Sequence, residues 1–250
     1  MQWYQGPEGD QRIWYEPEDI EQIATEQLRR AGLMPTLTDP VTDVERLIEV
    51  HLRAELDLYA TLPDGVLGLT EFPDRGAPKV LIDKVLTECR DAEGATTGAV
   101  GRWRATLAHE ASHIFLHRYL FDPDMAQLAG RTGVVDGPGA PSSPGLSRGR
   151  LMRCLHRDIS PNVPEWTSTR RRSDWREVQA NRSMAALLMP RRVFRRIALR
   201  EMQQLHLGTP PVAATDAEML VVVLADLLQV SKQAAAIRLA SESFTTAGNS

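Results

Sequence analysis

The hydrophobic positions in the first fifty residues follow helical spacing. Between residues 16 and 32, apolar side chains recur three or four positions apart, and Gly32 follows the last of them. A second helical pattern begins at Val44, where Thr42 and Glu45 have the spacing of a capping box. These features predict two helices in this part of the chain.

The pattern then changes to a period of two. Apolar and polar residues alternate over 56–60 and more loosely over 66–72, and a third short apolar run follows at 80–82. Proline and glycine at 63–65 and 73–76 separate these runs and are typical of turns. The sequence therefore predicts a small antiparallel sheet.

Helical spacing returns after residue 101. Helices are predicted over residues 102–120, from Asp174 to Met189, after Pro190, and at about 216–229 and 232–243. Residues 130–149 hold six Gly and three Pro, which predicts a flexible loop inside an insertion spanning about 121–172.

The order of these elements, helices then strands then helices, predicts an α+β fold with a helical tail. Three parts follow from it. Residues 1–40 form an N-terminal helix and linker, residues 41–205 the main domain, and residues 206–250 a helical C-terminal subdomain.

Composition and charge exclude several classes of protein. No apolar run approaches the roughly 20 residues that cross a bilayer. The only two cysteines, Cys89 and Cys154, exclude a disulfide scaffold and favour a cytoplasmic location. Residues 1–100 carry 20 acidic and 9 basic side chains, and residues 101–250 carry 13 and 20. Because the whole chain is acidic, with a net charge of −4, we expect the two parts to neutralise each other rather than to bind nucleic acid.

The chemistry centres on an HExxH sequence formed by His109, Glu110 and His113. Histidines four positions apart lie on one helix face, so both imidazoles can reach one zinc ion. Glu110 then lies beside the open coordination position, where it can accept a proton from the attacking water. These residues predict a zinc-dependent hydrolase, with another divalent metal such as Mn²⁺ as an alternative.

A third protein ligand is needed, and the spacing leaves its identity open. His117 lies one turn after His113, but a straight helix does not bring three successive turns to one ion, so we expect His117 to support the site rather than to bind metal. Glu177 and Asn181 lie one turn apart on a second helix. Glu177 can bind the metal while Asn181 orients a histidine, or Glu177 can instead complete a capping box with Asp174.

Four segments resemble the ImmA/IrrE family of metallo-endopeptidases. RWRATLAHEASHIFLH at 102–117 resembles that family's RFTLAHELGHLLLH helix, and EVQANRSMAALLMP at 177–190 resembles its ExxANxFAAxLLMP segment. VTDVERLIE at 41–49 and VSKQAAAIRL at 230–239 are similar to its PVDVExLIE and VSxxAxxxRL motifs. Ala111 and Ser112 depart from the usual Leu-Gly, and Ala105 from Phe, without changing a metal-binding atom.

The resemblance implies a zincin-like domain, with a small antiparallel sheet packed on the HExxH helix. It implies that His109, His113 and Glu177 hold the metal and that Glu110 is the catalytic base. It also implies a specific protein substrate, a helix-turn-helix transcriptional repressor. A donor to the developing oxyanion is required as well, and Tyr119, His156 and the arginines at 170–172 are the candidates. An exposed strand at 80–82 or 66–72 is expected to bind extended substrate.

An alternative function remains open. Residues 224–239 are also typical of a helix-turn-helix, so the chain can instead be a DNA-binding or metal-sensing regulator without hydrolysis. Only Lys232 and Arg238 supply positive charge on its second helix, which serves phosphate contact poorly. Five arginines between 191 and 200 form either a docking face for a protein partner or a solvated helix face.

Overall fold

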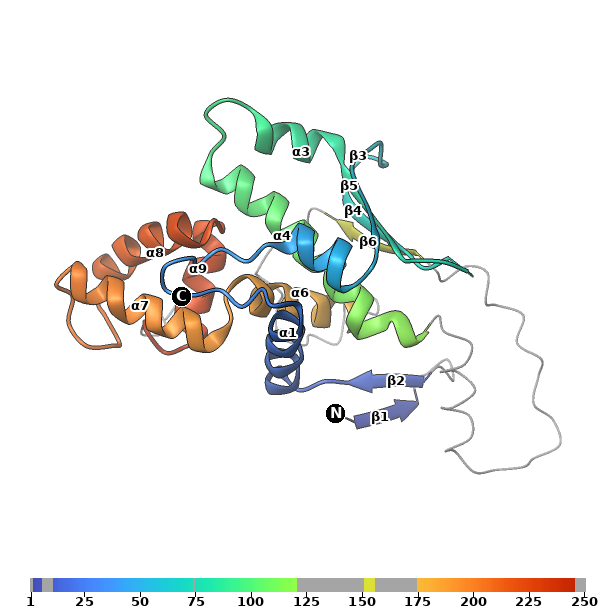
Figure 1. Ribbon diagram of the computed structural model, residues 1–250. Coiled ribbons are helices and arrows are strands. Elements are labelled where there is room, and N and C mark those ends of the chain that lie inside the picture. Colours follow the sequence, from blue (N-terminus) through green and yellow to red (C-terminus); the bar gives the residue numbers. More distant parts are fainter. Residues whose placement is uncertain (1, 6–10, 74, 121–150, 156–174, 246–250) are drawn as a thin grey trace.

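A computed structural model of the chain describes residues 2–5, 11–73, 75–120, 151–155 and 175–245 (Figure 1). The strands are β1 (Gln2–Gln5), β2 (Gln11–Trp14), β3 (Glu55–Ala60), β4 (Val66–Glu71), β5 (Lys79–Asp83) and β6 (Leu151–Leu155). The helices are α1 (Pro17–Ala31), α2 (Val44–Arg46), α3 (Lys84–Asp91), α4 (Thr97–His117), α6 (Trp175–Leu188), α7 (Arg191–Gln204), α8 (Ala214–Leu228) and α9 (Lys232–Ser241). A π-helical turn, η1 (Leu47–His51), continues α2, and a 3₁₀ turn, η2 (Arg118–Leu120), continues α4.

The main sheet has the strand order β3-β5-β4-β6. β4 is antiparallel to both β5 and β6, but β3 is parallel to β5, so the prediction of a purely antiparallel sheet is wrong. Alternation along a strand shows which residues face the core and carries no information about the direction of the partner strand. The expectation that 66–72 or 80–82 forms an exposed edge is also wrong, because β4 and β5 occupy the two central places.

β6 falls inside the segment predicted to be a flexible insertion. It pairs with β4 from Leu151 to Leu155, so residues 121–172 contain at least one ordered strand. The Gly- and Pro-rich run at 130–149, like His156, the arginines at 170–172 and Asp174, lies outside the described residues.

The helix cap predicted at the end of α1 is confirmed, whereas the cap predicted at the start of α2 is not. α1 ends at Gly32, whose φ of 68° is the left-handed conformation expected of a C-cap. The predicted capping box at Thr42 is wrong: Asp43 accepts the hydrogen bond from the Arg46 amide, while the Thr42 hydroxyl is buried and donates to the Leu187 carbonyl.

α4 begins five residues before the predicted start, capped by the side chain of Thr96. The helix was predicted to begin only after Gly101, because glycine weakens helices. The packing explains why glycine is used here. A Cβ on Gly101 would lie 2.6 Å from the Ser231 nitrogen, in the turn between α8 and α9.

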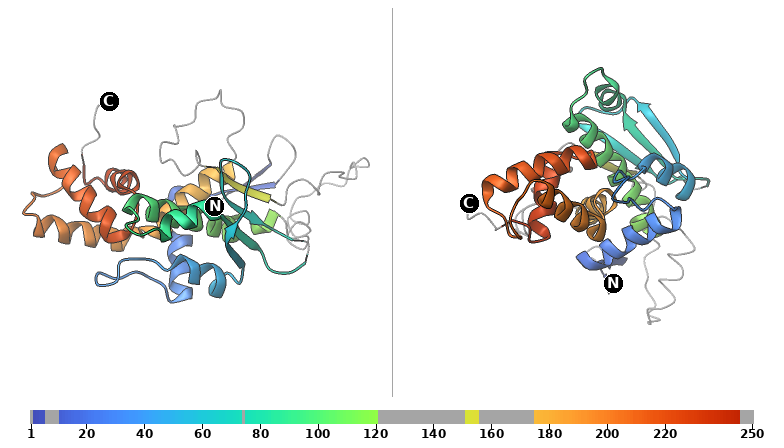
Figure 2. Two further views of the ribbon diagram at one scale, coloured as in Figure 1. Left: turned by 90° about the horizontal axis from the view of Figure 1, so that it is seen from above. Right: turned by 60° about the vertical axis from the view of Figure 1, so that its left-hand side comes forward.

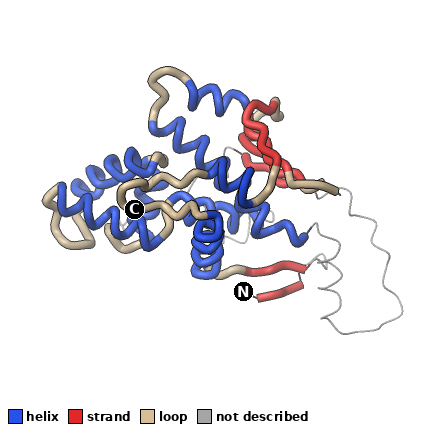
Figure 3. The backbone as a smooth tube through the Cα atoms, in the orientation of Figure 1, coloured by secondary structure: helices blue, strands red, loops and turns tan. Residues whose placement is uncertain are grey.

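α4 is the central element of the molecule. It contacts the helices α3 and α6 and the strands β4, β5 and β6. Figure 2 shows the sheet and the helices α7–α9 on opposite sides of it, and Figure 3 shows the same separation of strands from C-terminal helices. Because it is enclosed in this way, most of α4 from Gly101 to His117 is buried, charged and polar residues included.

An N-terminal hairpin precedes α1 where only a helix and linker were predicted. β1 and β2 pair antiparallel, and Ile13 and Tyr15 pack with Ile20 and Leu116 in a small cluster separate from the main core. The hairpin therefore contacts the C-terminal end of α4. Within the described residues, no single helix is long and apolar enough to cross a membrane, although the bent pair α8 and α9 meets that test when combined.

Candidate metal centre

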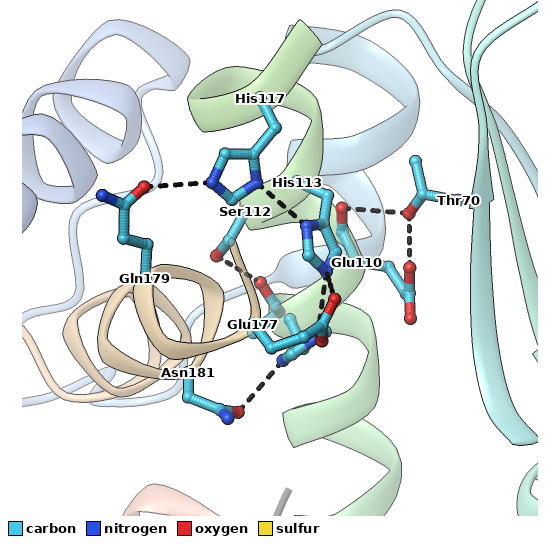
Figure 4. Close-up of polar contacts among 10 residues, drawn as sticks. Thr70, Glu110, Ser112, His113, His117, Glu177, Gln179 and Asn181 are labelled. Carbon is cyan, nitrogen blue, oxygen red and sulfur yellow. Dashed lines mark hydrogen bonds and ion pairs between the residues drawn. The ribbon is translucent and has the colours of Figure 1, made fainter. Parts of the chain in front are cut away.

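Three possible metal ligands meet between α4 and α6. His109 and His113 lie one turn apart on α4 and are fully buried. Glu177 approaches His113 from the first turn of α6 (Figure 4). One ligand atom from each of these residues lies within 4.8 Å of the others. The structure thus brings together the three residues that the family resemblance implied.

The donor atoms lie close enough together to reach one metal ion. His109 Nε2 lies 3.0 Å from His113 Nε2 and 3.0 Å from Glu177 Oε2, and His113 Nε2 lies 3.5 Å from Glu177 Oε1. Ligands at about 2.0–2.1 Å from a tetrahedral zinc are separated by about 3.3 Å. Two imidazoles and one carboxylate are also a donor set that catalytic zinc sites use, so the residues present suit this metal.

Electrostatics favours an ionised carboxylate at this place. Burial opposes charge on Glu177, but the imidazoles of His113 and His109 outweigh it and hold the pKa of Glu177 well below its usual range. Burial likewise lowers the pKa of His109, but the hydrogen bond and charge of Glu177 outweigh that effect, and the pKa is raised. Each group thus stabilises the charged form of the other, as a metal would stabilise the carboxylate in their place.

Asn181 orients His109 from α6. Its Oδ1 lies 3.1 Å from His109 Nδ1, one helical turn beyond Glu177. This contact assigns a proton to Nδ1, so Nε2 is the nitrogen that is left to bind a metal. The supporting role of Asn181 stays a prediction, and it requires a contact of this kind.

His117 contacts the other ligand histidine. His117 Nδ1 lies 3.0 Å from His113 Nδ1, and its Nε2 lies 3.1 Å from Gln179 Oε1. Burial first, and then the neighbouring His113, hold the pKa of His117 well below its ordinary value, so the ring is neutral. Trp175 packs edge-on against it.

Glu110 lies on the side of α4 that faces the sheet. The hydroxyl of Thr70, on β4, donates to the Glu110 carboxylate and lies 3.3 Å from the Glu110 carbonyl oxygen (Figure 4). Gly68 makes room for this side chain, since a Cβ there would lie 2.7 Å from Glu110 Oε1. The predicted catalytic base is thus held by β4.

Sequence reasoning missed Thr70, Gly68 and Gln179. Gly68 and Thr70, at alternate positions among Val66, Leu67 and Leu69, were an available signal for the first two. Nothing in the pattern around Gln179 distinguishes it. Tyr119, a predicted oxyanion donor, accepts a hydrogen bond from the Ile13 amide at 3.1 Å. The other candidates, His156 and the arginines at 170–172, lie outside the described residues.

Comparison with known families adds to this geometry. The model of peptidase family M78, described as the IrrE N-terminal-like domain, matches residues 154–240. That range includes Glu177, Asn181 and the helices α6–α8, and the HExxH helix precedes it. No curated protein and no solved structure matches the chain. The match to the IrrE N-terminal-like peptidase domain over residues 154–240 confirms the resemblance of the chain to the ImmA/IrrE metallopeptidases.

Proposed function

We propose that this protein is a zinc-dependent endopeptidase. The observation that carries the proposal is the convergence of His109, His113 and Glu177 within reach of one ion, with the buried carboxylate of Glu110 on the same helix as the two histidines. A regulatory metal site needs ligands only, whereas hydrolysis also needs a base adjacent to them. The family match supports a peptidase independently of this geometry.

The residues of the chain divide the work of hydrolysis. A zinc ion held here would polarise the scissile carbonyl and acidify water. Glu110 accepts the proton of the attacking water and returns it to the leaving amine as the peptide bond breaks. Asn181 and His117 hold the two histidines in the required orientation.

The edge of β6 is the proposed binding place for an extended substrate segment. β6 pairs with β4 opposite Gly68 and Thr70, the residues that hold Glu110, and its other side has no partner strand among the described residues. Backbone pairing to such an edge aligns a peptide without regard to its sequence. We further propose a helix-turn-helix repressor as the natural substrate, which rests on the family resemblance alone.

The alternative of a DNA-binding regulator is not favoured. α8 and α9 cross at 114°, as in a helix-turn-helix. Arg238, however, is buried and donates to the Met189 carbonyl, which leaves Lys232 as the exposed base on the described part of α9. In the basic face of α7, Arg191 and Arg195 pair with Glu242 and Arg200 with Glu201, which favours a structural role.

The test is metal content together with hydrolysis, measured on the full chain. Wild type should bind about one zinc per chain, and Glu177→Ala should lose most of it. Glu110→Gln should keep the zinc and lose cleavage of a mixture of internally quenched peptides. Glu49→Ala, which changes an exposed glutamate, is the control and should match wild type. Wild type without zinc, or a fully active Glu110→Gln, would contradict the proposal.

A further inference from the structure

A continuous polar path leads from the metal ligand His113 to the N-terminal hairpin. His113 Nδ1 contacts His117 Nδ1 at 3.0 Å, His117 Nε2 contacts Gln179 Oε1 at 3.1 Å, and Gln179 Nε2 donates to the Ile13 carbonyl at 3.1 Å. All three side chains on the path are buried, so water does not compete for these contacts. Residues 13 and 179 are 166 positions apart in the sequence.

The donors and acceptors along this path are consistent in a single direction. When His113 presents the lone pair of Nε2 to a metal, its proton is on Nδ1 and is donated to His117 Nδ1. A neutral His117 then carries its own proton on Nε2 and donates it to Gln179 Oε1. The amide nitrogen of Gln179 completes the path by donating to Ile13. Reversing either link of His117 would place a proton on the metal-binding nitrogen of His113, and the Ile13 carbonyl can only accept.

The end of the path is itself fixed in place. The Ile13 amide donates to the hydroxyl of Tyr119, just beyond the end of α4, while its carbonyl accepts from Gln179 on α6. The Ile13 side chain is buried in the cluster with Leu116. β2 is therefore held between the two helices that carry the ligands.

We propose that the N-terminal hairpin is part of the metal centre. The Ile13 carbonyl, acting through Gln179 and His117, fixes the tautomer and ring orientation of His113 and thereby sets the affinity for zinc. Gln179 and His117 are positioning residues in this arrangement. The proposal rests on the proposed metal site and goes beyond it by giving residues 11–14 a functional role.

Zinc affinity, measured by competition with a chromophoric chelator, tests the proposal without a substrate. Gln179→Leu removes the amide at similar size and should weaken zinc binding about 10- to 100-fold, as loss of an outer hydrogen bond typically does. Tyr119→Phe keeps the ring and frees the Ile13 amide, and should weaken binding in the same direction by less. Gln203→Leu, at an exposed position on α7, should bind as wild type does.

The Co²⁺-substituted protein provides a second measurement. A reoriented His113 changes the coordination geometry, so the visible absorption of Co²⁺ should change in Gln179→Leu. In Gln179→Asn the absorption should return toward that of wild type only if the shorter amide still reaches His117. Should Gln179→Leu fail to fold, the Tyr119→Phe affinity decides alone. Wild-type affinity in both folded variants would overturn the inference. Absence of zinc from the wild-type protein would instead overturn the proposed metal site.

Discussion

The Glu110 carboxylate on α4 accepts a hydrogen bond from the Thr70 hydroxyl on β4. Because of this contact, the role of Glu110 in proton transfer can be tested separately from metal binding. A hydroxyl that donates to a carboxylate stabilises its ionised form and fixes its direction. The contact involves no metal ligand, so its loss should affect proton transfer without affecting metal binding.

Thr70→Val is the corresponding test, because valine keeps the shape of threonine and removes the hydroxyl. A hydrogen bond to a charged group contributes about 1.5–3 kcal/mol, so kcat for the quenched peptides should fall about 10- to 100-fold while zinc content stays at the wild-type level. Thr70→Ser, which keeps the hydroxyl, should retain most of the activity. If Thr70→Val and Thr70→Ser have the same kcat, the hydroxyl of Thr70 does not contribute to activity and Thr70 is only a packing residue.

Asn181 tests the support of the other ligand. Asn181→Ala removes the acceptor for the His109 Nδ1 proton, and zinc affinity should fall about 10- to 100-fold. Asn181→Asp keeps an acceptor and adds negative charge, so it should bind zinc at least as tightly as wild type. Chelator competition measures both, and an unchanged affinity in the alanine variant would contradict the assigned role.

At the scale of elements, two glycines of α4 differ in how closely neighbouring segments approach them. Gly98 and Gly101 lie in the same helix, but a Cβ on Gly98 has only a side-chain atom of Thr96 at 3.6 Å, whereas one on Gly101 would meet the backbone of Val230 and Ser231. The same substitution should therefore have opposite effects at the two positions.

Gly98→Ala should raise the free energy of unfolding by up to about 1 kcal/mol, since alanine restricts the unfolded chain and favours helix. Gly101→Ala should lower it by about 1–3 kcal/mol, because α4 or the α8–α9 turn must shift. Urea denaturation of the two variants beside wild type gives both values. A stabilised Gly101→Ala would show that this close approach is not maintained in solution.

Helices and strands could be predicted where residues close together in the sequence determine them. The pairs His109–His113 and Glu177–Asn181 share helix faces because four-residue spacing is a property of any helix. The meeting of these faces was not predictable from spacing, since 63 residues separate His113 from Glu177 and their approach depends on the packing of α6 against α4. The hairpin β1–β2 and the strand β6 were missed for the same reason, because their pairing partners supply most of the stabilisation.

At the scale of the whole molecule, Arg238 joins the C-terminal helices to the rest. Its guanidinium donates to the Met189 carbonyl at 2.7 and 3.1 Å, at the end of α6, and pairs with Glu21 on α1. Glu242 lies beside it and also pairs with Arg191. One buried side chain thus connects three parts of the chain that are distant in sequence.

Arg238→Met should lower the free energy of unfolding by about 3–5 kcal/mol, because it leaves Glu21 and the Met189 carbonyl buried without their partner. For a chain of this size the melting temperature should fall by about 6–20 °C. Arg192→Met, at an exposed position on α7, is the control and should change stability by less than about 0.5 kcal/mol. A shift no larger than that of the control would contradict the role of Arg238.

The position of α4 couples local unfolding of the C-terminal helices to metal binding. The helix bears the ligand histidines toward one end and lies against the α8–α9 turn at the other, so neither region can separate from it without disturbing a shared backbone. Local openings of proteins occur in cooperative units, and a ligand stabilises every unit that must open to release it. Zinc should consequently slow amide hydrogen exchange in α8 and α9, although neither helix supplies a ligand to the proposed site. The rate of amide hydrogen exchange in α8 and α9 would then depend on whether the metal site is occupied.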